Sequence, residues 1–227
     1  MAGDDGVADR LLRLDSCTVS DAMDQLGLEG AVTGLAPAWR CGRIAGRVRT
    51  VELRPLRPGE PGRAGPHLGA TAIERSSPGD VIVVAHHGRT DSAGWGGLLS
   101  AAAVVVGVAG VIVDGACRDV EEAEAHGLPL FARSATPRSA RGRTVEASSG
   151  GPIEIRGVPV GQGDYVIADA SGVVVLPEAA AADVVAAAEA LAERERGMLD
   201  ALRRHVPVSR VMDHTYETML RARGRSS

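Results

Sequence analysis

Aromatic residues are scarce in this chain, whose 227 residues include one phenylalanine, two tyrosines and two tryptophans. So few rings cannot form a stacking surface for single-stranded nucleic acid. A basic excess is also missing, because the formal net charge is −4 and the isoelectric point lies near 5.9. Both absences argue against nucleic acid as a partner, since its binding depends on neutralising phosphates.

Cysteines and long apolar runs are equally limited. The three cysteines form an odd set without the spacing of a metal or redox motif, which favours a reducing compartment. No apolar run reaches the ~18 residues of a membrane-spanning helix. The opening residues, MAGDDGVADR, are acidic and lack the apolar stretch of a signal peptide. The sequence therefore predicts a cytoplasmic protein that binds no membrane.

Aliphatic residues, in contrast, are abundant, and segments typical of strands alternate with segments typical of helices. This alternation predicts an α/β fold. A chain of this length can bury one substantial core. We expect a single domain over residues 1–227, with its core at about 18–176 and a C-terminal helical segment at about 177–220.

Residues 94–119, with the sequence GWGGLLSAAAVVVGVAGVIVDGACRD, carry the most informative pattern in the chain. Two glycines precede the apolar segment 98–106, which predicts a buried helix that ends at Gly107. Residues 108–113 are mostly β-branched and predict a strand covered on both faces. The polar pair 114–115 is predicted to end this strand.

Three groups that can bind a substrate are predicted to lie close together in this segment: the amide N–H groups of the glycine turn, the Arg118 guanidinium and the Asp119 carboxylate. Glycines at a helix start leave amide N–H groups open to an anion. The residues predicted to bind substrate in this way are Gly96, Gly97, Leu98 and Leu99. Arg118 and Asp119 follow the strand at its carboxyl end, where open α/β sheets place their ligands.

Arg118 and Asp119 have two interpretations. The guanidinium of Arg118 suits the carboxylate and adjacent oxygen of a 2-oxo acid, and Asp119 is a ligand type preferred by Mg²⁺ or Mn²⁺. In the alternative interpretation both are surface residues, with Asp119 as the N-cap of a following helix and Arg118 paired with Glu122. The residues alone leave both interpretations open.

His86, His87 and Asp91 follow a predicted buried strand at 81–85 and precede the glycine turn. One histidine is predicted to handle protons at the site. The alternative is a polar loop, because adjacent side chains point apart and no third ligand completes a zinc site. Trp95 is expected either to form an apolar wall of the site or to pack in the core.

Two other loops contain basic residues that either contact an anion or lie in solvent. One is the Gly/Pro-rich region at 55–67, with Arg57, Arg63 and His67, and the other is a basic cluster of Arg133, Arg138, Arg141 and Arg143. Regular elements are expected as helices at 8–14, 21–26 (capped by Ser20), 68–75, 120–125 and 177–204, and as strands at 47–53 and 129–132.

The region around the Arg118-Asp119 pair resembles the RraA-like family, which includes 4-hydroxy-4-methyl-2-oxoglutarate and 4-carboxy-4-hydroxy-2-oxoadipate aldolases and ribonuclease E regulators. The aldolases carry an aspartate where this chain has Gly97, whereas the regulators carry glycine there and an acid at the position of Glu122. Further matches are TVSDAMDQLG at 18–27, FARSATPRSARGR at 131–143 and GDYVIADASGVVVLP at 163–177. The resemblance extends over about residues 18–220.

This resemblance implies a fold, an assembly and a cofactor. The fold is an α/β/β/α sandwich of the swivelling-domain type with a long C-terminal helix. The assembly is a homotrimer or a hexamer with sites at subunit interfaces, and the cofactor is Mg²⁺ or Mn²⁺ at Asp119. In the aldolases a glutamate from this helix enters a neighbouring subunit's site, and Glu195 is the best match. The alternative for Glu195 is an exposed, ion-paired helix face.

The expected activity is that of a class II pyruvate aldolase or oxaloacetate decarboxylase, a metal-dependent lyase that cleaves a bond next to a 2-oxo acid through an enolate. Arg118, Asp119 and Glu195 are the predicted catalytic residues. Decarboxylation is ranked above aldol cleavage because Gly97 replaces the aldolase aspartate. The alternative is a non-catalytic ribonuclease E regulator. An adenosyl-dependent methyltransferase is set aside, since no strand ends in the glycine-rich turn and ribose-binding acid of such enzymes.

Overall fold

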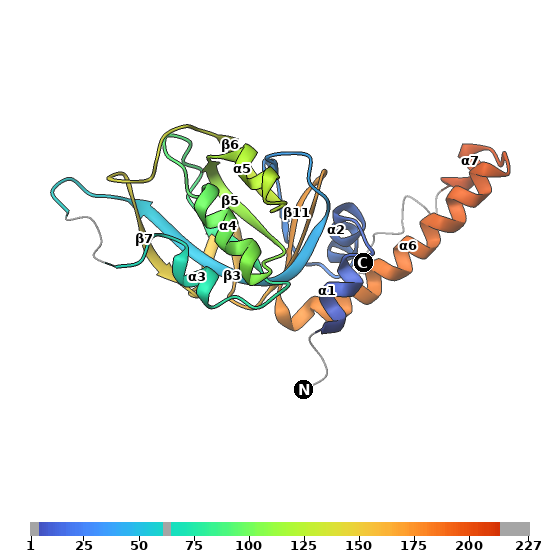
Figure 1. Ribbon diagram of the computed structural model, residues 1–227. Coiled ribbons are helices and arrows are strands. Elements are labelled where there is room, and N and C mark those ends of the chain that lie inside the picture. The colour runs from blue at the N-terminus through green and yellow to red at the C-terminus, as the bar shows by residue number, and fades with distance from the viewer. Residues whose placement is uncertain (1–4, 61–64, 214–227) are drawn as a thin grey trace.

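The computed structural model describes residues 5–60 and 65–213. Nine strands form one sheet with the order β1-β11-β10-β3-β4-β5-β6-β2, to which β7 is added by pairing with β3, and β8 and β9 pair with each other in a separate two-stranded sheet. Helices lie on both sides of the strands (Figure 1). The strands are β1 (Ala31–Val32), β2 (Ala36–Pro37), β3 (Ile44–Pro55), β4 (Val81–Ala85), β5 (Gly110–Cys117), β6 (Leu130–Ala135), β7 (Thr144–Ser149), β8 (Ile153–Ile155), β9 (Val158–Val160), β10 (Tyr165–Asp169) and β11 (Gly172–Leu176). The helices are α1 (Asp5–Leu11), α2 (Ser16–Gln25), α3 (Ala70–Glu74), α4 (Gly97–Val106), α5 (Val120–Ala125), the 3₁₀ turn η1 (Glu178–Ala180), α6 (Ala181–Arg203) and α7 (Val208–Val211).

The long strand β3 connects two halves of the sheet. Its residues 44–47 pair antiparallel with β10, and its residues 48–52 pair parallel with β4. The pairs β4–β5 and β5–β6 are also parallel. The carboxyl ends of β3, β4, β5 and β6 therefore lie along one edge, where α/β folds place their ligands.

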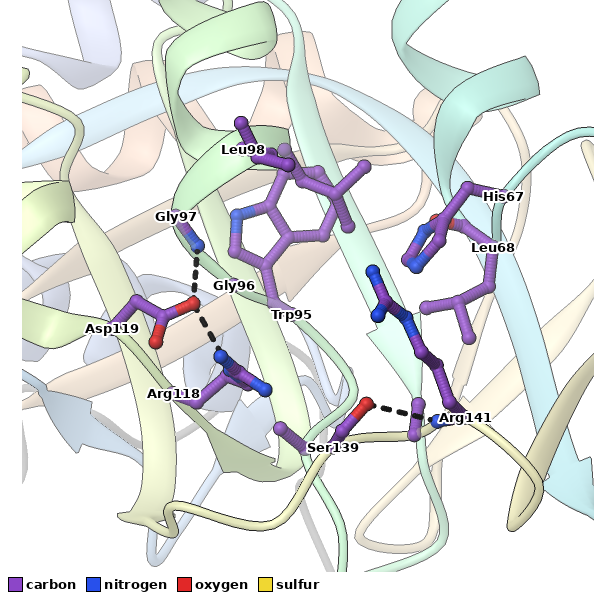
Figure 2. A pocket seen from close by; sticks show the side chains of 13 residues that line it. His67, Leu68, Trp95, Gly96, Gly97, Leu98, Arg118, Asp119, Ser139 and Arg141 are labelled. Carbon is purple, nitrogen blue, oxygen red and sulfur yellow. Dashed lines mark hydrogen bonds and ion pairs between the residues drawn. The ribbon is translucent and has the colours of Figure 1, made fainter.

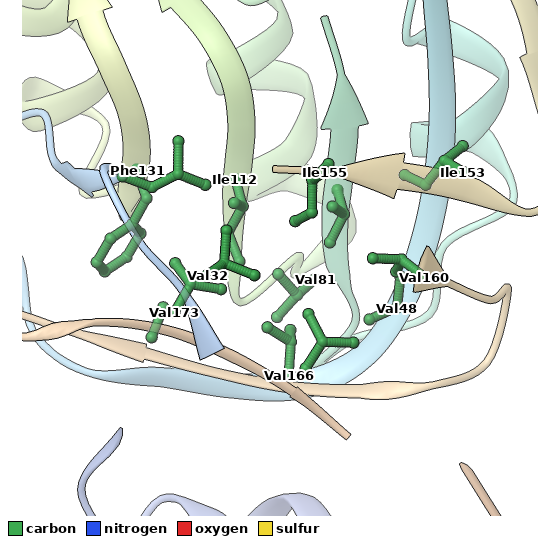
Figure 3. Packing of buried hydrophobic residues seen from close by; sticks show 14 of the residues in the cluster. Val32, Val48, Val81, Ile112, Phe131, Ile153, Ile155, Val160, Val166 and Val173 are labelled. Atoms are coloured by element: carbon green, nitrogen blue, oxygen red, sulfur yellow. The ribbon is translucent and has the colours of Figure 1, made fainter. Parts of the chain in front are cut away.

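Three buried clusters separate four layers of structure. Along β4, Ile82 and Val84 pack with residues of α3, α4 and α5. The alternate residues Val81 and Val83 face the other way, into a cluster with β8 to β11 (Figure 3). On the far side of β10, Ile167 packs with α1, α2 and α6. The layers therefore follow the order α/β/β/α, and this arrangement and the long helix α6 confirm the predicted fold.

The strand β5 is longer than its pattern predicted. Asp114 and Gly115 do not end it, because the strand continues to Cys117. Asp114 is 3% exposed and stays in a central strand because the Nε atom of Arg133 on β6 donates to its Oδ1 atom at 2.6 Å. This extension brings Arg118 directly to the end of the strand.

The helix α2 begins at Ser16, so the predicted start at residue 21 with Ser20 as its cap is wrong. Asp15 is the cap, and its carboxylate accepts a hydrogen bond from the Thr18 N–H at 2.8 Å. Aspartate is a favoured N-cap, and the earlier start also buries Val19 against the core.

Other boundaries shift at the ends of elements. The first helix begins at Asp5 instead of Ala8, and α3 is shorter than predicted because Gly69, at φ 79°, ends the preceding loop in a left-handed conformation. The last long helix begins at Ala181, after η1, and ends at Arg203. The predicted limits of β4 and the stop of α4 at Gly107 match the structure. Residues 214–220, which were predicted as helical, lie outside the described residues.

No helix in the described residues is long and apolar enough to cross a membrane.

Candidate active site

A cavity of about 270 Å³ opens at the carboxyl end of β5. Its walls come from the segment before α3, the glycine turn, the start of α4, the Arg118-Asp119 pair and the loop between β6 and β7 (Figure 2). This volume lies near the lower end of the range for small-molecule sites. The lining residues are His67, Leu68, Ala93, Trp95, Gly96, Gly97, Leu98, Leu99, Arg118, Asp119, Ser139, Ala140 and Arg141.

Trp95 and Ser100 fix the start of α4. The indole of Trp95 is 2% exposed, and its Nε1–H donates to the Ser100 hydroxyl at 3.1 Å. The Ser100 N–H closes the first helical turn on the carbonyl of Gly96 at 3.0 Å. Trp95 both packs in the core and lines the cavity, so the two interpretations of this residue are compatible.

Asp119 connects the glycine turn to Arg118. Its Oδ2 atom accepts hydrogen bonds from the Gly97 N–H at 3.1 Å and from the Arg118 Nε–H at 3.0 Å. Asp119 has φ 55°, a left-handed conformation that aspartate tolerates better than most residues. Asp119 occupies the N-cap position of α5, as the surface interpretation expects, but its carboxylate makes no capping hydrogen bond. Arg118 pairs with Asp119 and not with Glu122, and both residues line the cavity.

The carboxyl group of Asp119 is stabilised as an anion. Partial burial on its own raises its pKa, but the hydrogen bonds from Arg118 and the Gly97 amide and the charge of Arg118 outweigh burial, so the pKa lies below its usual value. Asp119 is therefore suited to bind a cation and poorly suited to donate a proton.

The donor set at Asp119 fits a hydrated magnesium or manganese ion. Within residues 5–60 and 65–213, no three His, Cys, Asp or Glu side chains are grouped closely enough to enclose a metal. A closed zinc site is therefore ruled out among these residues. Magnesium commonly keeps several waters and uses one or two carboxylates, and the Oδ1 atom of Asp119 accepts no hydrogen bond from a described residue.

The amide cradle is smaller than the sequence predicted. The Gly97 N–H already donates to Asp119, which leaves the N–H groups of Leu98 and Leu99 in the first turn of α4 without helical partners. The Arg118 side chain is 37% exposed, and its terminal nitrogens make no hydrogen bond to a described residue. Two amides and a guanidinium thus remain for an anion.

Glu122 lies where a side chain at position 97 would be. A Cβ atom built on Gly97 would overlap the Glu122 carboxylate. The acid at 122 and the glycine at 97 are therefore spatially linked, although they are far apart in sequence. An aspartate at 97 requires Glu122 to move, and this is feasible because the overlapping atoms are at the end of a flexible side chain.

His86, His87 and Asp91 do not line the cavity. His86 is fully buried, and its Nε2 atom lies 2.9 Å from the carbonyl of Ser92; burial lowers its pKa. His87 contacts Glu52 at 2.6 Å, and Asp91 pairs with Arg89. The side chains of these three residues therefore point away from the cavity. The contact of His86 with Ser92 stabilises the loop that leads to the glycine turn.

Glu195 also lies away from the cavity of its own chain. It lies on α6, in the helical layer opposite α4 (Figure 1). Burial, followed by the charges of Asp15 and Asp21, raises its pKa. Glu195 therefore reaches such a cavity only if it belongs to another copy of the chain.

Sequence reasoning missed some lining residues and left others undecided. Ser139 and Ala140 lie in the family-like segment 131–143 but were not singled out as site residues, whereas His67 and Arg141 were noted as members of basic loops. Of the other basic residues in these loops, Arg133 pairs with Asp114, and Arg63 lies outside the described residues. His67 and Arg141 differ from these neighbours because they line the same cavity as Asp119.

Comparison with known proteins identifies the family to which this chain belongs. Residues 16–175 match the RraA-like model, described as Aldolase/RraA. The chain is 33% identical to a Halalkalibacterium halodurans protein named "putative 4-hydroxy-4-methyl-2-oxoglutarate aldolase", over 70% of this chain and 71% of that protein. It is 31% identical to the protein DlpA of Legionella pneumophila over 78% of this chain, but this match spans only 28% of DlpA. Streptomyces coelicolor RraAS2, described as an unusual member of the RNase ES inhibitor RraA family, superimposes with a TM-score of 0.77 and 26% identity, over 86% of this chain and 96% of that one.

Proposed function

The chain belongs to the RraA-like family, and we propose that it is a divalent-metal-dependent lyase that cleaves a carbon–carbon bond next to a 2-oxo acid. The observation that carries this proposal is the arrangement at Asp119. Its ionised carboxylate, the Arg118 guanidinium and the start of α4 line one small cavity. An anion site next to a cation site is what a 2-oxo acid and a divalent metal require.

The chain's own residues bind and orient the substrate. The terminal nitrogens of Arg118 and the N–H groups of Leu98 and Leu99 hold the substrate carboxylate. Through its Nε–H bond to Asp119, Arg118 also fixes the position of that carboxylate relative to the substrate. Trp95 and Leu68 supply apolar wall that limits water around the reacting bond.

Asp119 would hold the metal, with waters as the other ligands, and a metal bound there supplies Lewis acidity that draws electrons from the breaking bond toward the ketone. In decarboxylation of oxaloacetate the bond to the distal carboxylate, not the one held by Arg118, breaks and CO₂ leaves. The bonding electrons remain on the 2-oxo acid as an enolate, which takes a proton from water to give pyruvate, so no base is needed on a substrate hydroxyl. Aldol cleavage does need a base to take the hydroxyl proton. Because Gly97 offers none, we rank oxaloacetate-type decarboxylation first.

Glu122 is the first candidate for a substitute base if aldol cleavage occurs. Glu122 does not itself line the cavity, but its carboxylate lies in the volume that a side chain at position 97 would fill, next to the lining residue Gly97. Glu122 is a better candidate for this base than His86 or His87, because His86 is fully buried and His87 pairs with Glu52.

Replacing Gly97 by aspartate tests this ranking. The added carboxylate can orient a proton carrier, which is typically worth about 10² to 10⁴ in rate. We therefore expect Gly97→Asp to raise pyruvate release from 4-hydroxy-4-methyl-2-oxoglutarate relative to that from oxaloacetate by roughly 10²-fold, in parallel assays with Mg²⁺. Gly97→Ala is the matched control, because it also displaces Glu122 but adds no charge. Equal losses of both activities in the two variants would mean that glycine is a steric requirement at position 97. The ranking of decarboxylation above aldol cleavage would then have no support from Gly97.

We further propose that the active assembly is a homotrimer or a dimer of trimers in which Glu195 enters a neighbour's cavity. The outer face of α4 is apolar and unpartnered in a single chain, with Leu98 85% and Val105 86% exposed. Leu98 also lines the cavity, so a subunit that covers this face adjoins the site. Such a cover stabilises the assembly by removing apolar surface from water.

A mixing experiment tests the shared site. Asp119→Asn and Glu195→Gln chains are each expected to be weakly active alone, because each lacks one component of every site. After subunit exchange, about a quarter of sites in an equal mixture regain both residues when each site uses two chains. Activity should rise accordingly in a pyruvate-release assay. A mixture no more active than the average of its parents would place Glu195 outside the site.

A second candidate function is that of a regulatory protein-binding module without catalysis. Gly97 and Glu122 favour it, because they match the regulator pattern and not the aldolase pattern. The likeness to RraAS2 is consistent with this function. The two candidates differ in whether purified protein accelerates pyruvate release.

A further inference from the structure

The candidate active site continues into a second cavity. This second cavity has a volume of about 430 Å³ and lies over the start of β7. Four residues line both cavities, namely His67, Leu68, Ala140 and Arg141. The two therefore form one groove in which the shared residues mark the junction, and a substrate held at Arg118 can extend past them.

Arg141 contributes a cation to this junction. Figure 2 shows its guanidinium reaching into the cavity beside His67, from the side opposite Asp119. The backbone of its loop is fixed, because the Arg141 N–H donates to the Ser139 hydroxyl at 3.1 Å and the Arg141 carbonyl accepts from Arg143 at 3.3 Å. The side chain is thus presented from an ordered loop.

The guanidinium of Arg141 has no acidic partner within the described part of the chain. Other arginines near the site are paired, with Arg89 bound to Asp91 and Arg133 bound to Asp114. Asp119 is the sole acid that lines the first cavity among the described residues, and Arg118 already pairs with it. Arg141 is exposed, and no acid of the first cavity is left to offset its positive charge, which favours a ligand with a second negative charge there.

Glu146 limits how far such a charge can extend. It lines the second cavity, is 8% exposed, and its Oε2 atom accepts a hydrogen bond from the Gly69 N–H at 2.7 Å. A carboxylate offers neither a cation nor a hydrogen-bond donor, so an anion deeper in the groove would find no favourable contact at Glu146. The favourable position for a second anion is consequently the junction at Arg141.

We propose that Arg141, assisted by His67, forms a subsite for a second carboxylate of the substrate, distal to the 2-oxo acid end. This inference rests on the proposed function, because it takes the 2-oxo acid end to be held by Arg118 and α4. The ligand class is a 2-oxo acid longer than oxaloacetate, with a carboxylate at its other end that the reaction retains, because the distal carboxylate of oxaloacetate itself leaves as CO₂. The second cavity leaves room for uncharged atoms beyond that carboxylate.

Binding of unreactive probes in the presence of Mg²⁺ tests the subsite without turnover. Oxalate probes the 2-oxo acid end alone, and 2-oxoglutarate and 2-oxopentanoate have the same chain length but differ in the distal carboxylate. A charge-assisted hydrogen bond of this kind is worth roughly 10- to 100-fold in affinity. We expect calorimetric titration to show that preference for 2-oxoglutarate over 2-oxopentanoate.

Arg141→Gln should remove this preference and leave oxalate affinity unchanged. The control is Arg138→Gln, an arginine of the same loop that does not line either cavity, and it should retain the preference. Equal affinity of the unmodified protein for the two longer probes, or a preference that survives Arg141→Gln, would overturn the subsite alone. Absence of oxalate binding to the unmodified protein would overturn the proposed function together with the subsite.

Discussion

Asp119→Asn is expected to lower metal-dependent pyruvate release by about 10²- to 10³-fold, because charge stabilisation by a bound metal is worth several kcal/mol. The amide oxygen of asparagine can still accept the Gly97 N–H bond, so the glycine turn and the fold should be retained. What is lost is the negative charge of the sole carboxylate among the described residues that lines the cavity. Steady-state rates over a range of Mg²⁺ concentrations measure the effect.

Asp91→Asn is the matched control for this variant. Asp91 is exposed, pairs with Arg89 and lies outside the cavity, so its loss should leave the rate within about twofold of the unmodified protein. Thermal unfolding of both variants checks that the fold is intact. If Asp119→Asn keeps its rate and its dependence on Mg²⁺, the metal is held elsewhere and the assignment of Asp119 is wrong.

Arg118→Lys is expected to raise KM and lower kcat together, with a loss in kcat/KM of roughly 10- to 100-fold. In the structure the Arg118 Nε–H donates to Asp119 while its terminal nitrogens remain for the substrate. A lysine ammonium keeps the charge but cannot make both sets of contacts in one geometry. Initial-rate kinetics with oxaloacetate separate the two parameters.

The control for this second variant is Arg138→Lys, on the loop between β6 and β7 but outside the cavity. It should leave both kinetic parameters unchanged. An Arg118→Lys enzyme with ordinary KM and kcat would restrict Arg118 to a structural role as the partner of Asp119.

Much of the site's frame was predictable because its sequence pattern is strongly apolar. The helix at 97–106 and the strand at 81–85 have few polar residues, so their limits follow from composition. The strand is buried as predicted, but the prediction of a buried helix is wrong for the outer face of α4, where Leu98 and Val105 are 85% and 86% exposed. The position of Arg118 and Asp119 at a strand end followed from the same pattern. Even so, β5 extends beyond Asp114, because Arg133 on a neighbouring strand neutralises that acid. No local pattern reveals such a partner.

The remaining walls of the cavity depend on long-range contacts. The segment with His67 is anchored where the Gly69 N–H meets Glu146, a residue of β7. The loop with Arg141 is tied to the glycine turn by the Ala93 N–H, which donates to the Arg138 carbonyl at 3.0 Å. These contacts join residues that are distant in sequence, so single-sequence reasoning placed His67 and Arg141 in solvent-exposed loops as readily as in a site. The relation of Gly97 to Glu122 also became visible only in three dimensions.

The central claim is that this chain accelerates carbon–carbon bond cleavage with a divalent metal at Asp119. Its most direct test is the rate of pyruvate release from oxaloacetate by the purified protein with Mg²⁺ or Mn²⁺, measured against metal without protein and against protein with EDTA. We predict a rate well above the metal-only background that falls to the protein-free level with EDTA. A rate equal to that background with every divalent ion would contradict the claim and favour the regulatory function.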